Sequence, residues 1–174
     1  MKSLIILIVA IIFSTAANAC QCAFLPINTQ SVREAKNVFI FRLLSAELQN
    51  INTADPLSGL VIGKIQVVET LRGSTNAKAI RYSTLYFCCG SRLDVGKYYA
   101  AFTSEVGMQL SANFGNLIEI GDMYVPKKDA FRAKIESVLT GNVKLAGAFS
   151  EHKLNRTAQI PFPPAPPNDK DANK

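Results

Sequence analysis

Histidine is almost absent from this sequence: His152 is the only one among 174 residues. A Ser-His-Asp or Cys-His catalytic arrangement needs an imidazole held in place, and a catalytic metal bound by histidine usually needs two or three. His152 lies in a polar stretch before a proline-rich segment, which suits neither role. Phosphate-binding loops of the GxGxxG and GxxxxGK[ST] types are also absent. We therefore expect a protein that is not an enzyme and has no cofactor of its own.

Long apolar runs and dense basic clusters are missing as well. The longest apolar run, Leu4 to Phe13, is too short to cross a bilayer, which takes about 20 residues. Lys and Arg total 19 against 13 Asp and Glu, a formal net charge of +6, but they form no cluster dense enough for a nucleic-acid site. We expect neither a membrane span nor a nucleic-acid partner.

The first nineteen residues have the pattern of a secretory signal peptide. Lys2 precedes the apolar run, and Ala17-Asn18-Ala19 gives the small-x-small sequence of a signal-peptidase site. This pattern predicts a leader over residues 1–19 and a mature chain that begins at Cys20. The protein should then be exported, to the extracellular space or a periplasm.

The residues that follow have a mainly β composition. Ser31 and Glu34 have capping-box spacing, which predicts a short helix to about Lys36. β-rich runs separated by turn-forming residues then predict five strands, over residues 38–44, 60–71, 79–87, 98–103 and 108–112. Five short strands joined by turns favour a closed antiparallel barrel, because closure removes exposed strand edges.

A helical period replaces the strand pattern after Pro126. Asp129 is a candidate N-cap, an apolar stripe runs to Leu139, and Gly141 is placed to end the helix. We expect one domain over residues 20–142. The remaining residues, 143–174, are polar and then proline-rich, and they predict a disordered tail.

Four cysteines, Cys20, Cys22, Cys88 and Cys89, become disulfide candidates in an exported protein. Pairing Cys20 with Cys22 and Cys88 with Cys89 would close two very tight, strained rings. The other two pairings both tie the N-terminus to residues 88 and 89. One such bridge closes a loop of about seventy residues, which stabilises the fold by roughly 4 kcal/mol in the chain-entropy model.

Signal cleavage would also give Cys20 a free α-amino group beside its own carbonyl oxygen. These two atoms can form a five-membered chelate with a metal ion. A disulfide that holds this terminus would preorganise the chelate and reduce the entropy lost when a partner's metal binds. The alternative is that the bridge only fixes a loose end.

Several of these features together resemble the tissue inhibitors of metalloproteinases. They are the start Cys20-Gln21-Cys22, the sequence ETLRG at residues 69–73, and CGSRLDVGK at residues 89–97 before an aromatic strand. The resemblance covers roughly residues 20–125, the N-terminal netrin-like domain of that family. It implies a five-stranded barrel of the oligonucleotide/oligosaccharide-binding type with flanking helices.

The resemblance also implies a role for individual residues. Cys20 would chelate the active-site zinc of a target metalloproteinase, and Gln21 would enter the specificity pocket of that enzyme. A flanking ridge would be formed by Cys22, Leu85, Tyr86, Phe87 and Cys88. Cys20 and Cys89 would form the clamping disulfide, with Cys22 and Cys88 as a possible second pair.

The sequence also departs from the family pattern. The family has a cysteine near the position of Asn113 to Gly115, where this chain has none, and Gln21 is longer than the small hydroxylated residue common there. The cysteine-rich C-terminal domain of the family is missing. We expect a minimal, monomeric, single-domain relative.

Two other functions fit the same sequence. The first is a netrin-like binding module without inhibitory activity, which would hold a glycan or protein partner through exposed residues such as Lys64, Arg81 and Tyr82. The second is a lipoprotein acylated at Cys20, which would block both the amine and the thiol.

Overall fold

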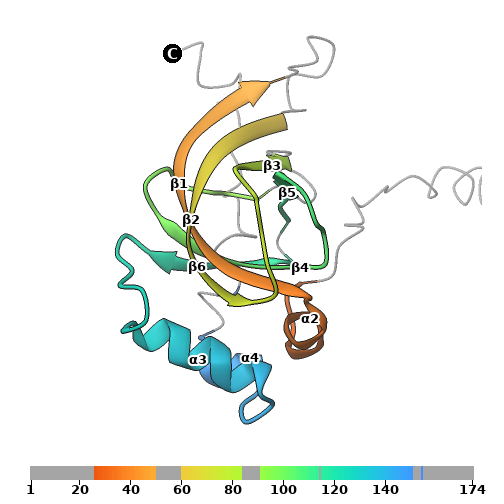
Figure 1. The fold of residues 1–174 in the computed structure, drawn as a ribbon, viewed down its shortest axis with the longest axis vertical. Helices are drawn as coiled ribbons and strands as arrows, with labels where there is room; N and C mark the ends of the chain where they lie inside the picture. Colours follow the sequence, from red (N-terminus) through yellow and green to blue (C-terminus); the bar gives the residue numbers. More distant parts are fainter. Residues whose placement is uncertain (1–25, 50–59, 84–90, 114, 151–153, 155–174) are drawn as a thin grey trace, which may run out of the picture.

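The computed structural model describes residues 26–49, 60–83, 91–113, 115–150 and 154. Within these residues, six strands form one mixed sheet in the order β5-β3-β2-β1-β4-β6, and three short helices pack on one side of it (Figure 1). The strands are β1 (Asn37–Gln49), β2 (Leu60–Arg72), β3 (Ala79–Ser83), β4 (Tyr98–Thr103), β5 (Gln109–Ser111) and β6 (Leu117–Gly121). The helices are α2 (Thr29–Glu34), α3 (Ala130–Leu139) and α4 (Leu145–Ala148). The expectation of a mainly β fold is confirmed.

The two longest strands, β1 and β2, curve strongly (Figure 1). Their antiparallel pairing shifts register at three places, between Val38 and Phe39, between Ile40 and Phe41, and between Leu43 and Ser45. Each extra residue in a strand bends it and increases its twist. The bulges therefore curl the middle of the sheet.

Alternating side chains of this curled sheet supply two separate cores. On the inner, concave face, Phe39, Phe41 and Tyr99 pack with residues of β2, β3 and β5. On the outer face, Val38 and Ile40 pack against the helices through Val32 and Ile135. Because both faces of this part of β1 are covered, residues 38–41 are almost entirely buried, as their continuous apolar sequence predicts.

The two edge strands of the sheet approach each other. β5 pairs in parallel with β3, and β6 pairs antiparallel with β4, yet only a short turn separates them. In this turn the Asn116 side chain donates to the Ser111 carbonyl at 2.8 Å, and the Asn116 carbonyl accepts from the Phe102 amide at 2.9 Å. No ladder joins β5 to β6 in the described residues, so the sheet is curled but not closed. The closed barrel of five strands that we expected is not seen: the described sheet has six strands, and its edge strands β5 and β6 do not pair with each other.

The helices agree with the sequence pattern, with one change at a cap. Asn28, and not Ser31, is the N-cap of α2: its side chain accepts from the Ser31 amide, and the Ser31 hydroxyl accepts from the Asn28 amide. Asp129 caps α3 as predicted, and Gly141 follows that helix with a φ of 88°.

The packed part of the chain extends past residue 142, where the sequence pattern ended the domain. Leu145 and Phe149, in and after α4, are both buried in the outer core, and the Phe149 ring lies 4.8 Å from that of Phe131. Among the described residues no helix is long and apolar enough to span a bilayer. The leader expected over residues 1–19 and the tail beyond residue 154 lie outside the described residues.

Candidate functional site

The residues that the sequence predicts to act directly all lie outside the described part of the chain. They are Cys20, Gln21, Cys22, Leu85, Tyr86, Phe87, Cys88 and Cys89. The structure therefore tests neither the disulfides nor the chelating terminus. It does describe the residues on both sides of the 84–90 segment and most of the two sequence patterns that carry the resemblance.

The two ends of the 84–90 segment are held together. The Ser91 amide donates to the Ser83 carbonyl at 2.9 Å, directly after β3 ends. Ser91 is only 2% exposed, and Leu93 packs in the inner core. The chain that follows Cys89 is thus fixed to the sheet within two residues.

The LDVGK sequence, residues 93–97, forms a tight turn. The Lys97 amide donates to the Asp94 carbonyl at 3.3 Å, and Gly96 has a φ of 92°, which favours glycine at the third position of such a turn. The Gly96 amide donates to the Leu43 carbonyl at 2.7 Å, and the Leu43 amide donates to the Lys97 carbonyl at 3.0 Å. These bonds continue the pairing between β1 and β4 into the turn that precedes the start of β4.

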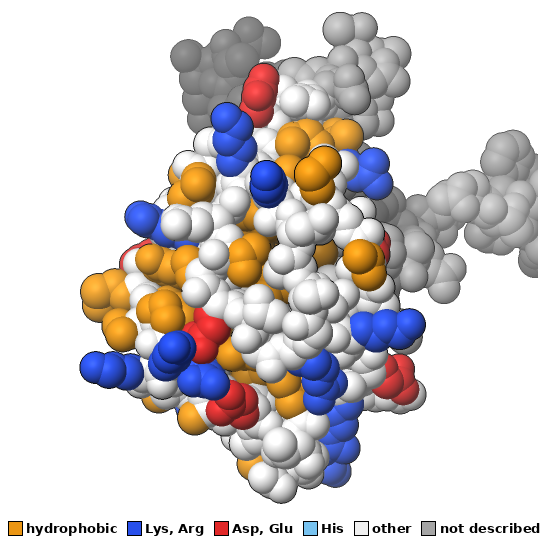
Figure 2. Space-filling model, viewed as in Figure 1, with side chains coloured by type: hydrophobic (Ala, Val, Ile, Leu, Met, Phe, Trp, Pro, Cys, Tyr) orange, Lys and Arg blue, Asp and Glu red, His pale blue; other side chains and the backbone are white. Residues whose placement is uncertain are grey.

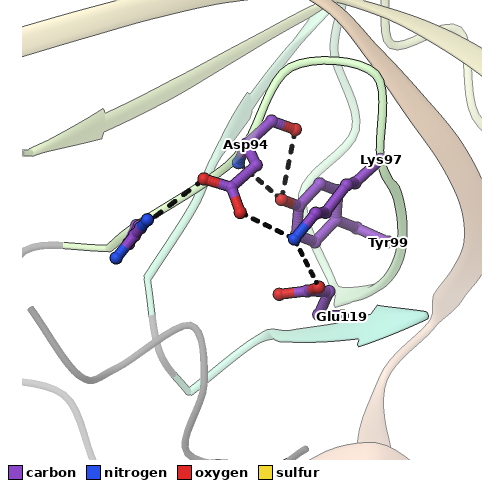
Figure 3. Close-up of polar contacts among 5 residues, drawn as sticks. Asp94, Lys97, Tyr99 and Glu119 are labelled. Carbon is purple, nitrogen blue, oxygen red and sulfur yellow. Dashed lines mark hydrogen bonds and ion pairs between the residues drawn. The ribbon is translucent and has the colours of Figure 1, made fainter. Parts of the chain in front are cut away.

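A cluster of charged side chains holds the turn from within (Figure 3). Lys97 Nζ lies 2.8 Å from Asp94 Oδ2 and 3.2 Å from Glu119 Oε1, so that one cation joins the turn to β6. The Tyr99 hydroxyl accepts from the Asp94 amide at 2.6 Å, and it lies 3.3 Å from the Asp94 carbonyl. Arg92 Nε lies 3.5 Å from Asp94 Oδ1.

The protonation states of this cluster are fixed around neutral pH. The hydrogen bond from Lys97 lowers the pKa of Asp94 more than burial raises it, and the same bond raises the pKa of Lys97. Burial raises the pKa of Tyr99 above its usual range. Asp94 is therefore a carboxylate, Lys97 a cation and Tyr99 a neutral phenol, so none of the three is suited to exchange protons at neutral pH. The cluster holds the turn against β6.

The ETLRG sequence, residues 69–73, connects the sheet to the helices. Arg72 donates from Nη1 to the carbonyls of Arg33 at 2.7 Å and Ala35 at 3.3 Å, and from Nη2 to Leu139 at 3.3 Å. These carbonyls end α2 and α3, where helices lack internal donors. A single guanidinium thus caps both helix ends.

Glu69 connects the same strand to the start of α3. Its carboxylate accepts hydrogen bonds from the Tyr124 hydroxyl and, at 3.1 Å, from the Lys127 amide. Arg132 Nε lies 3.3 Å from Glu69 Oε1. Burial, and then the hydrogen bond to Glu69, raise the pKa of Tyr124 above its usual range, so Tyr124 stays a neutral donor.

The sequence analysis expected Tyr82 to be exposed on the binding face of the alternative function, and this expectation is wrong. Tyr82 is only 5% exposed and packs in the inner core, so it cannot hold a ligand on the surface. Its neighbour in sequence, Arg81, points the opposite way and is exposed, as is Lys64 on the adjacent strand. The strict alternation of β3 explains the difference.

Glu119 is a site residue that sequence reasoning missed. It is 5% exposed on β6, a strand that the sequence pattern did not predict, and it binds Lys97 from 22 positions away. Only the tertiary fold brings these two residues together. No group of three or more potential metal ligands is found in the part of the chain that the structure describes.

Comparison with known proteins adds no identification. No protein-family model matches the sequence, and no curated protein matches it significantly.

Proposed function

We propose that this protein is an exported metalloproteinase inhibitor that acts through its processed N-terminus. The proposal rests on one observation: a CxC sequence at a predicted leader cleavage site, followed some seventy residues later by CGSRLDVG. The α-amino group and carbonyl oxygen of Cys20 would replace the water on the catalytic zinc of a target protease, since catalytic zinc sites keep one position open.

The geometry around the 84–90 segment supports this proposal. Inhibitors that bind without losing much entropy need their contact segments held in place beforehand. The Ser91 to Ser83 hydrogen bond joins the residues on both sides of the segment that carries Cys88 and Cys89, and the Asp94 to Lys97 turn follows directly after it. A disulfide from Cys20 to Cys89 would transfer that rigidity to the terminal amine.

The curled sheet also fits the proposed family. We infer that β5, the turn after it and β6 together act as one bent strand that completes a netrin-like barrel. The Asn116 hydrogen bonds, which join this turn to both edges of the sheet, support the inference.

The test compares two forms of the mature protein. One begins at Cys20 and the other carries one additional alanine before Cys20; their N-termini are verified by intact-mass measurement. We expect the first form to inhibit a collagenase-type zinc endopeptidase and the extended form to lose inhibition, because the added residue removes the amine from the chelate.

The matched control carries the extra alanine after Lys174 and should inhibit normally. Inhibition that survives the extension at Cys20 would show that the chelation mechanism is wrong. An acyl group on Cys20 in the exported protein would contradict the proposal directly.

A further inference from the structure

In the described part of the chain, helices cover the outer face of the sheet at only one end. At that end Val68 and Leu71 of β2 pack against the helix-side core. At the other end the outward residues of β2 are Ile62, Lys64 and Gln66, which alternate with the inward, buried Val61 and Ile65. This open end of the face is formed by β1, β2, β3 and β5.

Strand register places three basic residues in a diagonal row on this open face. Arg42 of β1 is opposite Gln66, two residues from Lys64. Lys64 is opposite Ala79 of β3, two residues from Arg81. From Arg42 to Lys64, and again from Lys64 to Arg81, the row crosses to the next strand and moves two residues along it in the same direction. Neighbouring Cα positions in the row are therefore about 8 Å apart.

These three residues, Arg42, Lys64 and Arg81, form what we call the basic stripe. All three are exposed, and the side chains of Lys64 and Arg81 form neither an ion pair nor a hydrogen bond with the residues that the structure describes. Arg42 donates to the Gly96 carbonyl at 3.0 Å and lies over the Tyr98 ring, contacts that orient its charge without neutralising it. Figure 2 shows mostly Lys and Arg among the charged side chains over the upper part of the molecule, where β2 and β3 lie in Figure 1.

Two carboxylates border the stripe without pairing with it. Glu47, near the C-terminal end of β1, is opposite Ile62. The Glu105 carboxylate accepts from the amide of Ser111 at 3.2 Å, and Ser111 is the residue of β5 that pairs with Arg81. The three basic residues of the stripe outnumber these two carboxylates. The open face thus keeps an excess of positive charge.

The spacing of the stripe indicates the shape of its ligand. The backbone positions of the three residues span about 16 Å from Arg42 to Arg81, which is longer than a single small anion such as phosphate. A linear chain with negative groups along its length can contact all three in sequence. The neighbouring exposed side chains, Ser45, Gln66 and Gln109, can hydrogen-bond hydroxyl groups.

The side chains around the stripe favour a polysaccharide over a nucleic acid. Proteins that bind single strands stack bases on exposed aromatic rings. Among the described residues, the aromatic ring next to the stripe is that of Tyr98, and the Arg42 guanidinium lies over it. The Tyr82 ring faces the inner core and is not available for stacking. We propose that the basic stripe binds a linear anionic polysaccharide, independently of the inhibitory terminus.

The experiment measures binding of the full mature protein to dextran sulfate, with uncharged dextran as the neutral probe. We expect the double variant Lys64→Gln/Arg81→Gln to bind dextran sulfate about tenfold more weakly at low salt, and the slope of log affinity against log salt to fall by about one to two. The variant should fold normally, since neither side chain has a partner among the described residues; its thermal unfolding verifies this.

The matched control is Lys128→Gln/Lys144→Gln, which removes the same charge from exposed positions near the helices. It should retain wild-type affinity within about twofold. Equal losses in the two double variants would show that net charge alone drives binding and would overturn the stripe. Equal binding of uncharged dextran, or tighter binding of oligo(dT) than of dextran sulfate, would overturn the choice of ligand.

Discussion

At the residue scale, Asn37 shows how one buried polar side chain connects separate loops. Its Oδ1 accepts from the Ser74 amide at 3.2 Å, and its Nδ2 donates to the Glu105 carbonyl at 3.1 Å. Gly73 has a φ of 68°, and any Cβ there would collide with this side chain and with the Lys36 carbonyl. The glycine that ends ETLRG is therefore required by close packing as well as by backbone conformation.

Asp94 allows a residue-scale prediction about acid stability. Its pKa is lowered by Lys97, so the carboxylate stabilises the fold above its unfolded-state pKa, which is near 4, and this contribution disappears as the pH falls through the folded-state pKa. We expect the free energy of unfolding of the wild type to decrease more steeply between about pH 5 and pH 2 than that of Asp94→Asn. Urea denaturation at a series of pH values measures both.

Asp122→Asn is the control for that measurement, because Asp122 is exposed and its side chain has no partner in the described residues. This variant should keep the pH dependence of the wild type. An Asp94→Asn protein with an unchanged acid slope would show that the Lys97 contact does not stabilise the folded state.

At the element scale, Arg72 fixes the helices to the sheet. Its guanidinium bonds three carbonyls from two helix ends, and Arg33 adds bonds to the Val138 and Gly141 carbonyls at 3.2 and 3.1 Å. A lysine carries its N–H donors on a single nitrogen, so it cannot reach carbonyls at two helix ends at once. Arg72 and Arg33 together fix the position of α2 relative to α3.

We expect Arg72→Ala to destabilise the protein by about 2 to 4 kcal/mol, since several partly buried carbonyls lose charged donors at once. Arg72→Lys should recover only part of this loss. Urea unfolding at neutral pH is the measurement. The control is Arg81→Ala, which removes an exposed side chain without a partner in the described part of the chain and should change stability by less than about 0.5 kcal/mol. If Arg72→Ala matches Arg81→Ala, the helix caps do not contribute.

Several elements could be predicted from the sequence because each has a local signal. The β-branched and aromatic run from Val38 predicts β1, and the Asp129 cap with its apolar stripe predicts α3. β6 and α4 were missed for physical reasons. β6 carries the buried Glu119, which breaks an apolar pattern, and α4 is a single turn whose N-cap Lys144 gives no side-chain capping bond.

At the scale of the whole molecule, α4 closes the helix-side core. Leu145 is 2% exposed and Phe149 is 4% exposed, and the Leu145 amide donates to Thr29 Oγ1 at 3.0 Å, which joins the two ends of the domain. The free energy of folding therefore depends on residues that the sequence pattern assigned to a tail.

Truncation after Asn142 should accordingly cost about 4 kcal/mol or more, because two large buried side chains are lost from the core. Truncation after Leu154 keeps every described contact and should change stability by no more than about 0.5 kcal/mol. Thermal and urea unfolding of the two shortened proteins decide the boundary. Equal stability of both would place the end of the domain at residue 142.

The sequence by itself determined the mainly β class, most strands, two helices and the chemistry available, because these depend on local periodicity, caps and residue counts. Tertiary structure alone decided what LDVGK and ETLRG do, since their partners lie up to 67 residues away. It also decided the alignment of Arg42, Lys64 and Arg81, because strand register is set by bulges and side-chain packing across the sheet, which no single segment encodes.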